Sequence, residues 1–171
     1  GGGIRMNSGC FGTEFKDILL SVQAVDREGK VLTIPSSDIK FEYRKNDLPK
    51  ELIFLSASFK GNFKNKDITK KDMEIFKKKK EETQPTKVKT GGSTFKNPTT
   101  QTNEKVWKLI KSSTPEDISF GDATISEKHS NFFVNKNNAT YEDMKKLIDF
   151  VRNSVRKKTG VNLDLEIEII G

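Results

Sequence analysis

Residues 140–171 read TYEDMKKLIDFVRNSVRKKTGVNLDLEIEIIG, and this stretch contains both the clearest helix and the clearest alternating segment of the chain. Apolar residues recur at helical spacing over 140–158, and Thr140 with Asp143 forms a capping-box pattern at the start. Farther on, apolar and acidic residues alternate, which predicts a strand over 163–170. We therefore interpret the helix as part of the scaffold, and the strand as having one apolar face and one acidic face.

The segment before this helix combines a short apolar strand with a polar cluster. Residues 132–134 read FFV and predict a buried strand, and the cluster Ser126–His129 lies just before it. His129 is the only histidine of the chain. A single histidine is most often structural, but the charged neighbours Glu127 and Lys128 are also compatible with a histidine that faces a pocket.

Residues 90–98, TGGSTFKNP, concentrate more chemically useful side chains than any other stretch of similar length. The two glycines let the backbone come close to a ligand, and the hydroxyl of Ser93 follows them directly. Lys96 supplies a cation, and Asn97 supplies a side chain that both donates and accepts hydrogen bonds. The same composition is also typical of a surface turn, so a functional interpretation needs partners elsewhere in the chain.

Residues 1 to about 66 predict a mostly antiparallel sheet. Two β-rich runs within 17–34 are joined by the turn Asp26–Gly29, which is a hairpin pattern. The best strand of this region lies within 51–60, and we expect its apolar run Leu52–Leu55 to be buried.

The chain opens on GGGIRMNSGCFG, residues 1–12, which begins in the middle of a motif. We therefore expect the chain to be a fragment of a longer protein. Gly9 and Gly12 would let the backbone approach a flat or phosphorylated cofactor, although glycines at this spacing more often mark turns. Cys10 is the only cysteine, which excludes an internal disulfide and fits a reducing, cytoplasmic setting.

Two further helices are predicted between these segments. The first covers 68–82, begins with the capping-box pair Thr69 and Asp72, and carries the lysine run Lys77–Lys80 near its C-terminal end. The second is a short helix over 104–112, whose Trp107 we expect to lie in the core.

The composition favours a soluble protein that binds anions. The net charge is +7, from 31 Lys and Arg against 24 Asp and Glu, so nucleic acid is the first partner to consider. The lysines are spread along the chain, however, and their one dense run has no interleaved aromatic residues for base stacking. A small molecule that carries phosphate suits the charge equally well. No apolar run approaches the roughly 20 residues that a membrane-spanning helix requires, and one Cys with one His cannot fill a structural zinc site.

Taken together, seven motifs of the chain occur in the order found in one enzyme family. They are GGGIRMNSGCFG (1–12), FEYRKN (41–46), LSASF (55–59), TQP (83–85), GGSTFKNP (91–98), SEKHSNFFVN (126–135) and LEIEIIG (165–171). On these residues the chain resembles the C-terminal part of UDP-N-acetylenolpyruvoylglucosamine reductase, also called UDP-N-acetylmuramate dehydrogenase, in the shorter of its two architectural types. The resemblance implies an FAD- and NADPH-dependent reduction of a UDP-sugar enolpyruvate in peptidoglycan precursor synthesis.

The resemblance also implies a role for ten residues. Arg44 matches the arginine near the substrate carboxylate, Ser93 the serine that protonates the intermediate carbon, and Glu166 the glutamate that aids the enol-like intermediate. Substrate binding is implied for Tyr43, Lys96, Asn97 and His129. Flavin binding is implied for Asn7, Gly9 and Gly12. In the family the last motif usually has the sequence Pro-Glu-Val-Arg, so Leu165 and Glu168 of this chain are departures from it.

The fold implied by the resemblance is α+β. Residues 1–83 would be the end of an FAD-binding α+β domain whose N-terminal part is missing, and 84–171 a two-layer α/β substrate-binding domain. Because half of the cofactor site would be missing, we expect the fragment alone to show weak turnover or none. Two other interpretations stay open, a basic nucleic-acid-binding module and an inactive remnant of the enzyme. The oligomeric state is open as well.

Overall fold

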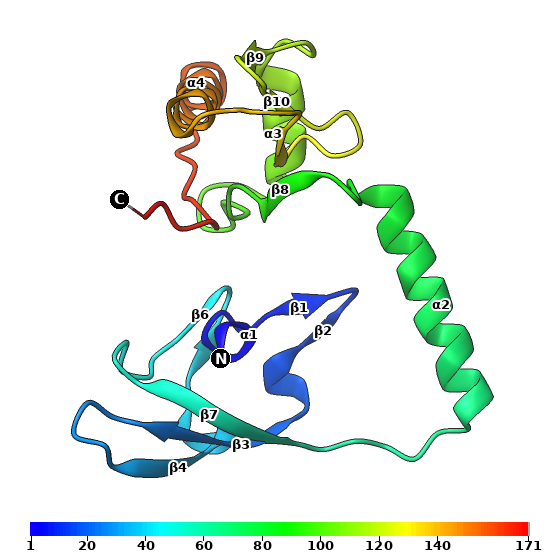
Figure 1. Cartoon of the computed structure of the whole chain (residues 1–171), viewed down its shortest axis with the longest axis vertical. Coiled ribbons are helices and arrows are strands. Elements are labelled where there is room, and N and C mark those ends of the chain that lie inside the picture. Colours follow the sequence, from blue (N-terminus) through cyan, green and yellow to red (C-terminus); the bar gives the residue numbers. More distant parts are fainter. Residues whose placement is uncertain (171) are drawn as a thin grey trace. The chain divides into compact units, whose positions relative to one another are not determined.

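The structure is a computed structural model that describes residues 1–170, and the chain divides into two units, Gly1–Asn65 and Lys66–Gly171 (Figure 1). Each unit has its own hydrophobic cluster and is considered by itself. Helix α2 (Lys66–Thr83) groups with the second unit, and the boundary predicted between residues 83 and 84 stays a prediction. Among the described residues, no helix is both long and apolar enough to cross a lipid bilayer.

The first unit is built on a three-stranded antiparallel sheet, as predicted. Its strand order is β4-β3-β7, and two small hairpins pair β1 with β2 and β5 with β6. The elements are α1 (Gly2–Arg5), β1 (Gly9–Cys10), β2 (Thr13–Glu14), η1 (Phe15–Asp17), β3 (Leu19–Val25), β4 (Val31–Pro35), η2 (Ser36–Asp38), β5 (Phe41–Glu42), β6 (Lys45–Asn46) and β7 (Ile53–Phe59). Ile4, Leu19, Val22 and Ile39 form the buried centre of this unit.

The hairpin predicted around Asp26–Gly29 is confirmed. The Asp26 carboxylate accepts hydrogen bonds from the backbone N–H groups of Glu28 and Lys30, and Gly29 has a φ of +83° that favours glycine. The expectation that Leu52–Leu55 would be buried is wrong for most of the run. Leu52 is buried, but Ile53 and Leu55 are 64% and 55% exposed. Strand β7 lies at an edge of the sheet, and only one of its faces meets the core of the unit.

The second unit combines a four-stranded antiparallel sheet with three helices. The sheet order is β8-β11-β10-β9. The elements are α2 (Lys66–Thr83), β8 (Lys89–Ser93), α3 (Val106–Ser113), β9 (Ser119–Phe120), β10 (Ala123–Ile125), β11 (Phe132–Asn135) and α4 (Tyr141–Thr159). The predicted helices and the strand at 132–134 are therefore confirmed, with ends shifted by one or two residues. Helix α2 begins at Lys66, two residues before its predicted start, so that Thr69 and Asp72 lie within the helix and do not form its cap.

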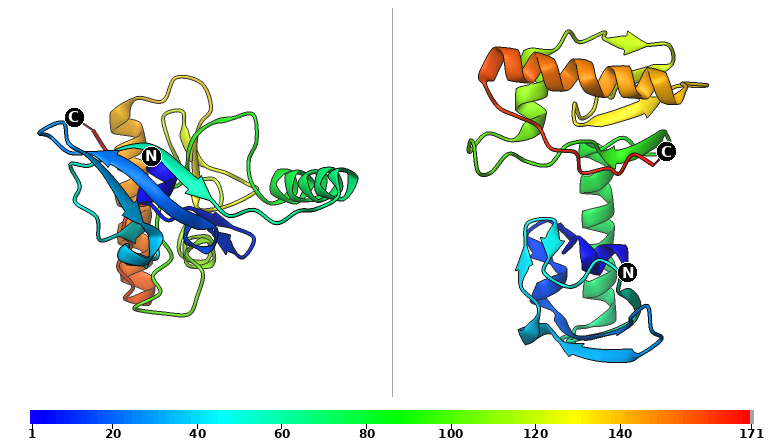
Figure 2. Two further views of the ribbon diagram at one scale, coloured as in Figure 1. Left: turned by 90° about the horizontal axis from the view of Figure 1, so that it is seen from below. Right: turned by 90° about the vertical axis from the view of Figure 1, so that its left-hand side faces the viewer.

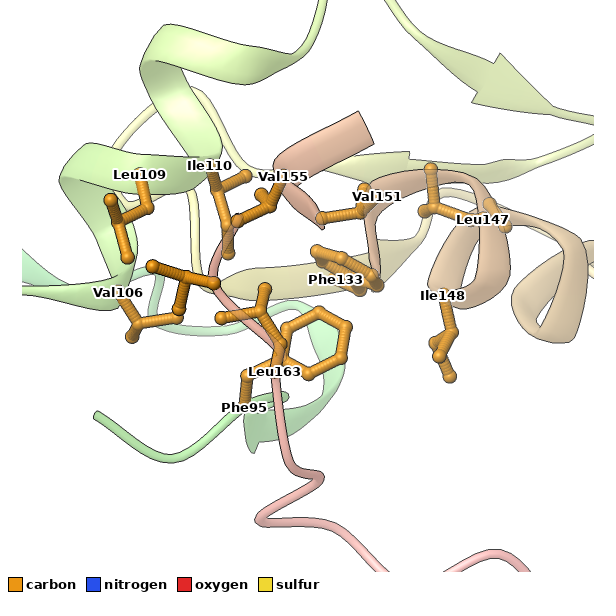
Figure 3. Packing of buried hydrophobic residues seen from close by; sticks show 12 residues of the cluster. Phe95, Val106, Leu109, Ile110, Phe133, Leu147, Ile148, Val151, Val155 and Leu163 are labelled. Atoms are coloured by element: carbon orange, nitrogen blue, oxygen red, sulfur yellow. The ribbon is translucent and has the colours of Figure 1, made fainter. Parts of the chain in front are cut away.

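The core of the second unit lies between its sheet and helices α3 and α4. Helix α4 contacts α3 and the β9–β10 end of the sheet (Figure 2). Figure 3 shows the side chains of α3, α4 and β11 pointing toward one another, with Phe95 and Leu163 beside them. The predicted capping box of α4 is present: the Thr140 hydroxyl accepts from the Asp143 N–H, and the Asp143 carboxylate accepts from the Thr140 N–H.

The strand predicted over 163–170 does not form. The tail bends at Glu166 and Ile167 and makes one isolated antiparallel bridge, between Leu165 and Phe95. To continue this pairing, Ile167 would have to lie opposite Ser93 and Glu168 opposite Gly92, but the bend at Glu166 and Ile167 interrupts it. Strand β8 is itself irregular there, since Gly92 has a φ of +88° and the pairing of β8 with β11 shifts register. Leu163 nevertheless reaches the core, so the alternation predicted the buried side chain but not the strand.

Candidate functional site

The C-terminal tail brings together residues that lie about 70 positions apart in the sequence. The Lys96 N–H donates to the Asp164 carbonyl at 2.8 Å, and the Glu166 N–H donates to the Thr94 carbonyl at 2.9 Å. These two bonds flank the Phe95–Leu165 bridge. The segment that carries Ser93 and Lys96 therefore lies directly beside the segment that carries Glu166. This meeting is the central feature of the candidate site.

Ser93 occupies the last position of β8, where the strand changes its course. Gly92, with its positive φ, precedes it, and the pairing of β8 with β11 shifts register at this point. Ser93 is paired with Phe132, and directly opposed residues of antiparallel strands project from the same face. Phe133, the next residue, points into the core. Ser93 therefore lies on the face of the sheet that is turned away from the core.

Asn97 connects this segment to helix α3. Its side-chain oxygen accepts a hydrogen bond at 3.1 Å from the backbone N–H of Val106, the first residue of the helix. That N–H is one of the donors that a helix start leaves unpaired, so Asn97 supplies an acceptor that the helix needs. Lys96 is half-buried, and the next residue after Asn97, Pro98, is buried. The assigned residues 93–97 thus sit on a firmly held segment.

A cavity of about 590 Å³ lies in the second unit. It is lined by Glu82, Thr83, Trp107, Lys111, Thr114, Pro115, Glu116 and the run Ile125–Ser130. The polar cluster that contains His129 therefore faces a pocket, which was one of the two alternatives that the sequence left open. The lining joins two cations, Lys111 and Lys128, with carboxylates and one large aromatic ring.

His129 is held in the wall of this cavity by two aromatic rings. Its ring centroid lies 4.9 Å from that of Phe132 and 6.3 Å from that of Trp107. The Asn131 backbone N–H donates to Nδ1 at 3.2 Å, so the imidazole proton lies on Nε2 in the neutral form. Burial lowers the pKa of His129 below its ordinary value of 6.5. The side chain is therefore neutral near pH 7.

Trp107 is the residue of this cavity that the sequence interpretation missed. We expected it in the core, but it is 38% exposed and lines the cavity. On α3 the core-facing residues are Val106, Leu109 and Ile110. Trp107 is one step from Val106, which is a turn of about 100° around the helix axis, so it projects elsewhere. The helical spacing of the apolar residues was the signal that could have identified it.

Arg44 and Tyr43, in the first unit, form the two-residue turn of the β5–β6 hairpin. Arg44 has a φ of +58°, which is uncommon for a residue with a side chain. Its guanidinium carbon lies 5.0 Å from the centroid of the Tyr43 ring. Both side chains are half-buried. The pair thus presents a cation stacked on an aromatic ring at the tip of a tight hairpin.

The three residues assigned to flavin binding differ in whether they leave space beside the backbone for a bound group. Asn7 is fully buried, and its amide donates to Glu14 and accepts from the backbone N–H of Lys16. A Cβ on Gly9 would come within 2.7 Å of the Glu14 side chain, so this glycine is required by the hairpin itself. Gly12 has a φ of +87° and nothing within 4 Å of a Cβ position. Only Gly12 therefore leaves the backbone open to a bound group.

Comparison with known proteins identifies relatives of the whole chain. Residues 84–170 match the family model described as UDP-N-acetylenolpyruvoylglucosamine reductase, C-terminal domain. A protein of that name from Pelagibacter ubique is 64% identical over 170 residues, which are 99% of this chain and 56% of the relative. The protein of that name from Rickettsia conorii is 43% identical over 171 residues, which are 57% of its length.

A solved structure agrees with these relatives. The crystal structure of UDP-N-acetylenolpyruvylglucosamine reductase from Thermus caldophilus superposes with a TM-score of 0.82 and 29% sequence identity, over 98% of this chain and 59% of that one. The chain therefore spans little more than half the length of the relatives it matches. Because residues 84–170 match the C-terminal domain of this family, the chain belongs to the UDP-N-acetylenolpyruvoylglucosamine reductase family.

Proposed function

We propose that this chain carries the substrate domain and the end of the flavin domain of an enzyme that reduces UDP-N-acetylglucosamine enolpyruvate to UDP-N-acetylmuramate with NADPH. The observation that supports this most is the contact of residues 94–96 with 164–166, since it joins the segments of Ser93 and Glu166. The product is a precursor of peptidoglycan. Arg44 belongs to the other unit, and its role is proposed on the resemblance of its Tyr-Arg motif alone.

The chain offers part of a site for FAD, which when bound supplies the hydride for this reduction. The open backbone at Gly12 suits the close approach of a flat or phosphorylated group. Asn7 and Gly9 support it indirectly, because they fix the hairpin on which Gly12 lies. The remaining flavin contacts would come from the part of the relatives that this chain does not span.

Three side chains would act on the reacting part of the substrate. The Arg44 guanidinium would pair with the carboxylate of the enolpyruvyl group and stabilise the charge that develops there. The Ser93 hydroxyl would donate its proton to the carbon next to that carboxylate. A serine hydroxyl is a weak acid, so the ammonium of Lys96, three residues farther along the same segment, would stabilise the alkoxide left behind. The Glu166 carboxylate would stabilise the enol-like intermediate from the neighbouring segment.

The cavity beside His129 would hold the rest of the sugar nucleotide. Trp107 gives it an aromatic surface for a flat base, and Lys111 and Lys128 give it cations for a diphosphate. Asn97 and Tyr43 are the other residues proposed to contact the substrate. The positive charge of the chain is explained equally by this anionic ligand, and no feature of the fold favours the nucleic-acid alternative.

The test uses a completed reductase, in which the unmatched part of the Pelagibacter ubique relative is joined to the start of this chain. With FAD and the enolpyruvyl substrate, we expect substrate-dependent oxidation of NADPH, which is measured as the loss of NADPH absorbance. The chain alone should turn over weakly or not at all. In the completed reductase, Ser93→Ala should lower kcat on the order of 100-fold or more, as expected for loss of a proton donor. No turnover by the completed protein would contradict the proposal and favour an inactive remnant.

A further inference from the structure

Asn131 has a buried polar side chain close to the candidate site, and none of the proposed roles uses it. It is only 3% exposed and lies directly before strand β11. A buried amide in an apolar setting is costly unless its donors and its acceptor are paired. Its partners therefore indicate what the side chain holds in place.

The Asn131 side chain pairs with both backbone groups of Phe95. Its Oδ1 accepts from the Phe95 N–H at 3.0 Å, and its Nδ2 donates to the Phe95 carbonyl at 2.8 Å. The carbonyl of Asn131 also accepts from the Thr94 N–H at 2.8 Å. Strand β8 ends at Ser93, so these three bonds replace the regular ladder just after the candidate proton donor.

The same residue connects two other parts of the candidate site. The Asn131 backbone N–H donates to Nδ1 of His129, in the wall of the cavity. On the other side, the Thr94 carbonyl accepts from the Glu166 N–H. A continuous series of hydrogen bonds thus runs from His129 through Asn131 and Thr94 to Glu166. Asn131 lies at the centre of this series and beside Ser93.

We propose that Asn131 is a positioning residue, which sets the Ser93 hydroxyl and the Glu166 carboxylate in register with the substrate cavity. This proposal rests on the proposed function. Phe95 is fully buried, so its N–H and carbonyl find no water when the asparagine amide is removed. The segment after Ser93 would then shift to pair these groups, and a small displacement of a reacting group slows catalysis strongly.

The test compares Asn131→Asp with a matched control at the other end of the same strand. Asn135 makes the same type of clamp, because its Oδ1 accepts from the Ala139 N–H at 2.9 Å and its Nδ2 donates to the Ala139 carbonyl at 3.4 Å. Asn135→Asp therefore perturbs an equivalent clamp that touches no residue of the candidate site. Both variants are made in the completed reductase. Asn131→Ser, which removes the amide donor without adding charge, serves as a second variant if the aspartate prevents folding.

We expect Asn131→Asp to lower kcat on the order of 10- to 100-fold while KM changes by less than about threefold, and Asn135→Asp to leave both nearly unchanged. Equal losses of kcat in the two variants would show a merely structural role and overturn the proposal. An unchanged kcat in Asn131→Asp would also overturn it, while turnover by the unsubstituted protein would still support the proposed function.

Amide hydrogen exchange of the full chain gives a readout that does not depend on turnover. In Asn131→Asp, the amides of Thr94, Phe95 and Glu166 should exchange faster than in the unsubstituted chain, and in Asn135→Asp they should not. If the completed reductase shows no turnover, the proposed function fails on that result alone. In that case, unchanged exchange rates of these three amides in Asn131→Asp would also contradict the proposal that Asn131 holds this segment, and faster exchange would support it.

Discussion

Arg44 has a backbone conformation that ordinarily favours glycine. Asn7, Phe11, Arg44 and Lys87 are the non-glycine residues with positive φ among residues 1–170. A side chain in this region costs on the order of 1 kcal/mol, which a glycine would avoid. At the tip of a two-residue hairpin turn, glycine or asparagine is the residue that conformational preference favours. An arginine there is consistent with the proposed contact to a substrate carboxylate.

Replacing this arginine should therefore separate stability from activity. Arg44→Gly is expected to keep the stability of the chain or raise it by up to about 1 kcal/mol, since the backbone strain is relieved. In the completed reductase the same change should lower kcat/KM on the order of 100-fold or more, because the guanidinium is lost. Urea unfolding and NADPH oxidation measure the two effects. Arg44→Lys, which keeps a charge but not the planar fork, should recover only part of the activity, and full recovery would contradict the proposed pairing.

The lowered pKa of His129 predicts that stability depends on pH below neutrality. Because the folded state favours the neutral imidazole, its contribution is fully present above the ordinary pKa of 6.5 and is lost as pH falls through the lowered pKa. No other histidine titrates in this range. The free energy of unfolding, followed by the fluorescence of Trp107, should therefore decrease between about pH 7 and about pH 5.

His129→Asn is the control for this effect, since an asparagine oxygen can accept from the Asn131 N–H but does not titrate. In the variant, the free energy of unfolding should lose most of its dependence on pH in this range, while the unfolding transition is still observed. If the free energy of unfolding of the variant depends on pH as strongly as that of the unsubstituted chain, the effect comes from titratable groups other than His129.

At the scale of elements, the parts that could be predicted were those in which local chemistry and tertiary packing agree. Helix α4 has its capping box at Thr140 and its apolar stripe on one side, and it forms within one residue of the predicted ends. The tail at 163–170 has an equally clear pattern, but a strand also needs a partner edge. Here the tail bends at Glu166 and Ile167 after its single bridge to Phe95, and the irregular end of β8 that it meets lies in a distant part of the chain.

Only part of the candidate site could be predicted from the sequence. The motif residues Ser93, Lys96 and Glu166 could be identified by resemblance, and the fold brings their segments together. Asn131 could not, because it looks ordinary in sequence, and Trp107 was missed although the helical spacing of its apolar neighbours contained the signal. A tryptophan on a short apolar helix is usually buried, and an asparagine before a strand usually marks a turn. Their roles depend on which side of the helix faces the cavity and on which backbone groups β8 leaves unpaired.

The cap of α4 provides a test of stability at this scale. Thr140→Ala removes the acceptor of the Asp143 N–H, and this should lower the free energy of unfolding by about 1 kcal/mol. The measurement is urea unfolding followed by circular dichroism. Thr100→Ala, at an exposed position in the loop before α3, is the control and should change the stability by less than about 0.5 kcal/mol. Equal losses in the two variants would contradict the assignment of the cap.

At the scale of the whole molecule, the two units divide the proposed work between them. The first holds Arg44 and the open backbone at Gly12, and the second holds the Ser93 and Glu166 segments together with the cavity. Each unit has its own buried cluster, that of the second being the larger. The part proposed to bind the sugar nucleotide thus has the core that folding in isolation requires.

Residues 66–171 alone should therefore fold and bind UDP. We expect calorimetry to give a dissociation constant within about threefold of that of the full chain, because the cavity residues Trp107, Lys111, Lys128 and His129 all lie in this unit. The isolated unit should not oxidise NADPH, since it lacks Arg44 and every residue assigned to the flavin. Trp107→Ala should weaken UDP binding on the order of 10-fold through loss of base stacking. If the full chain binds UDP and the folded unit does not, the cavity is not the nucleotide site, and contacts outside this unit must hold the substrate.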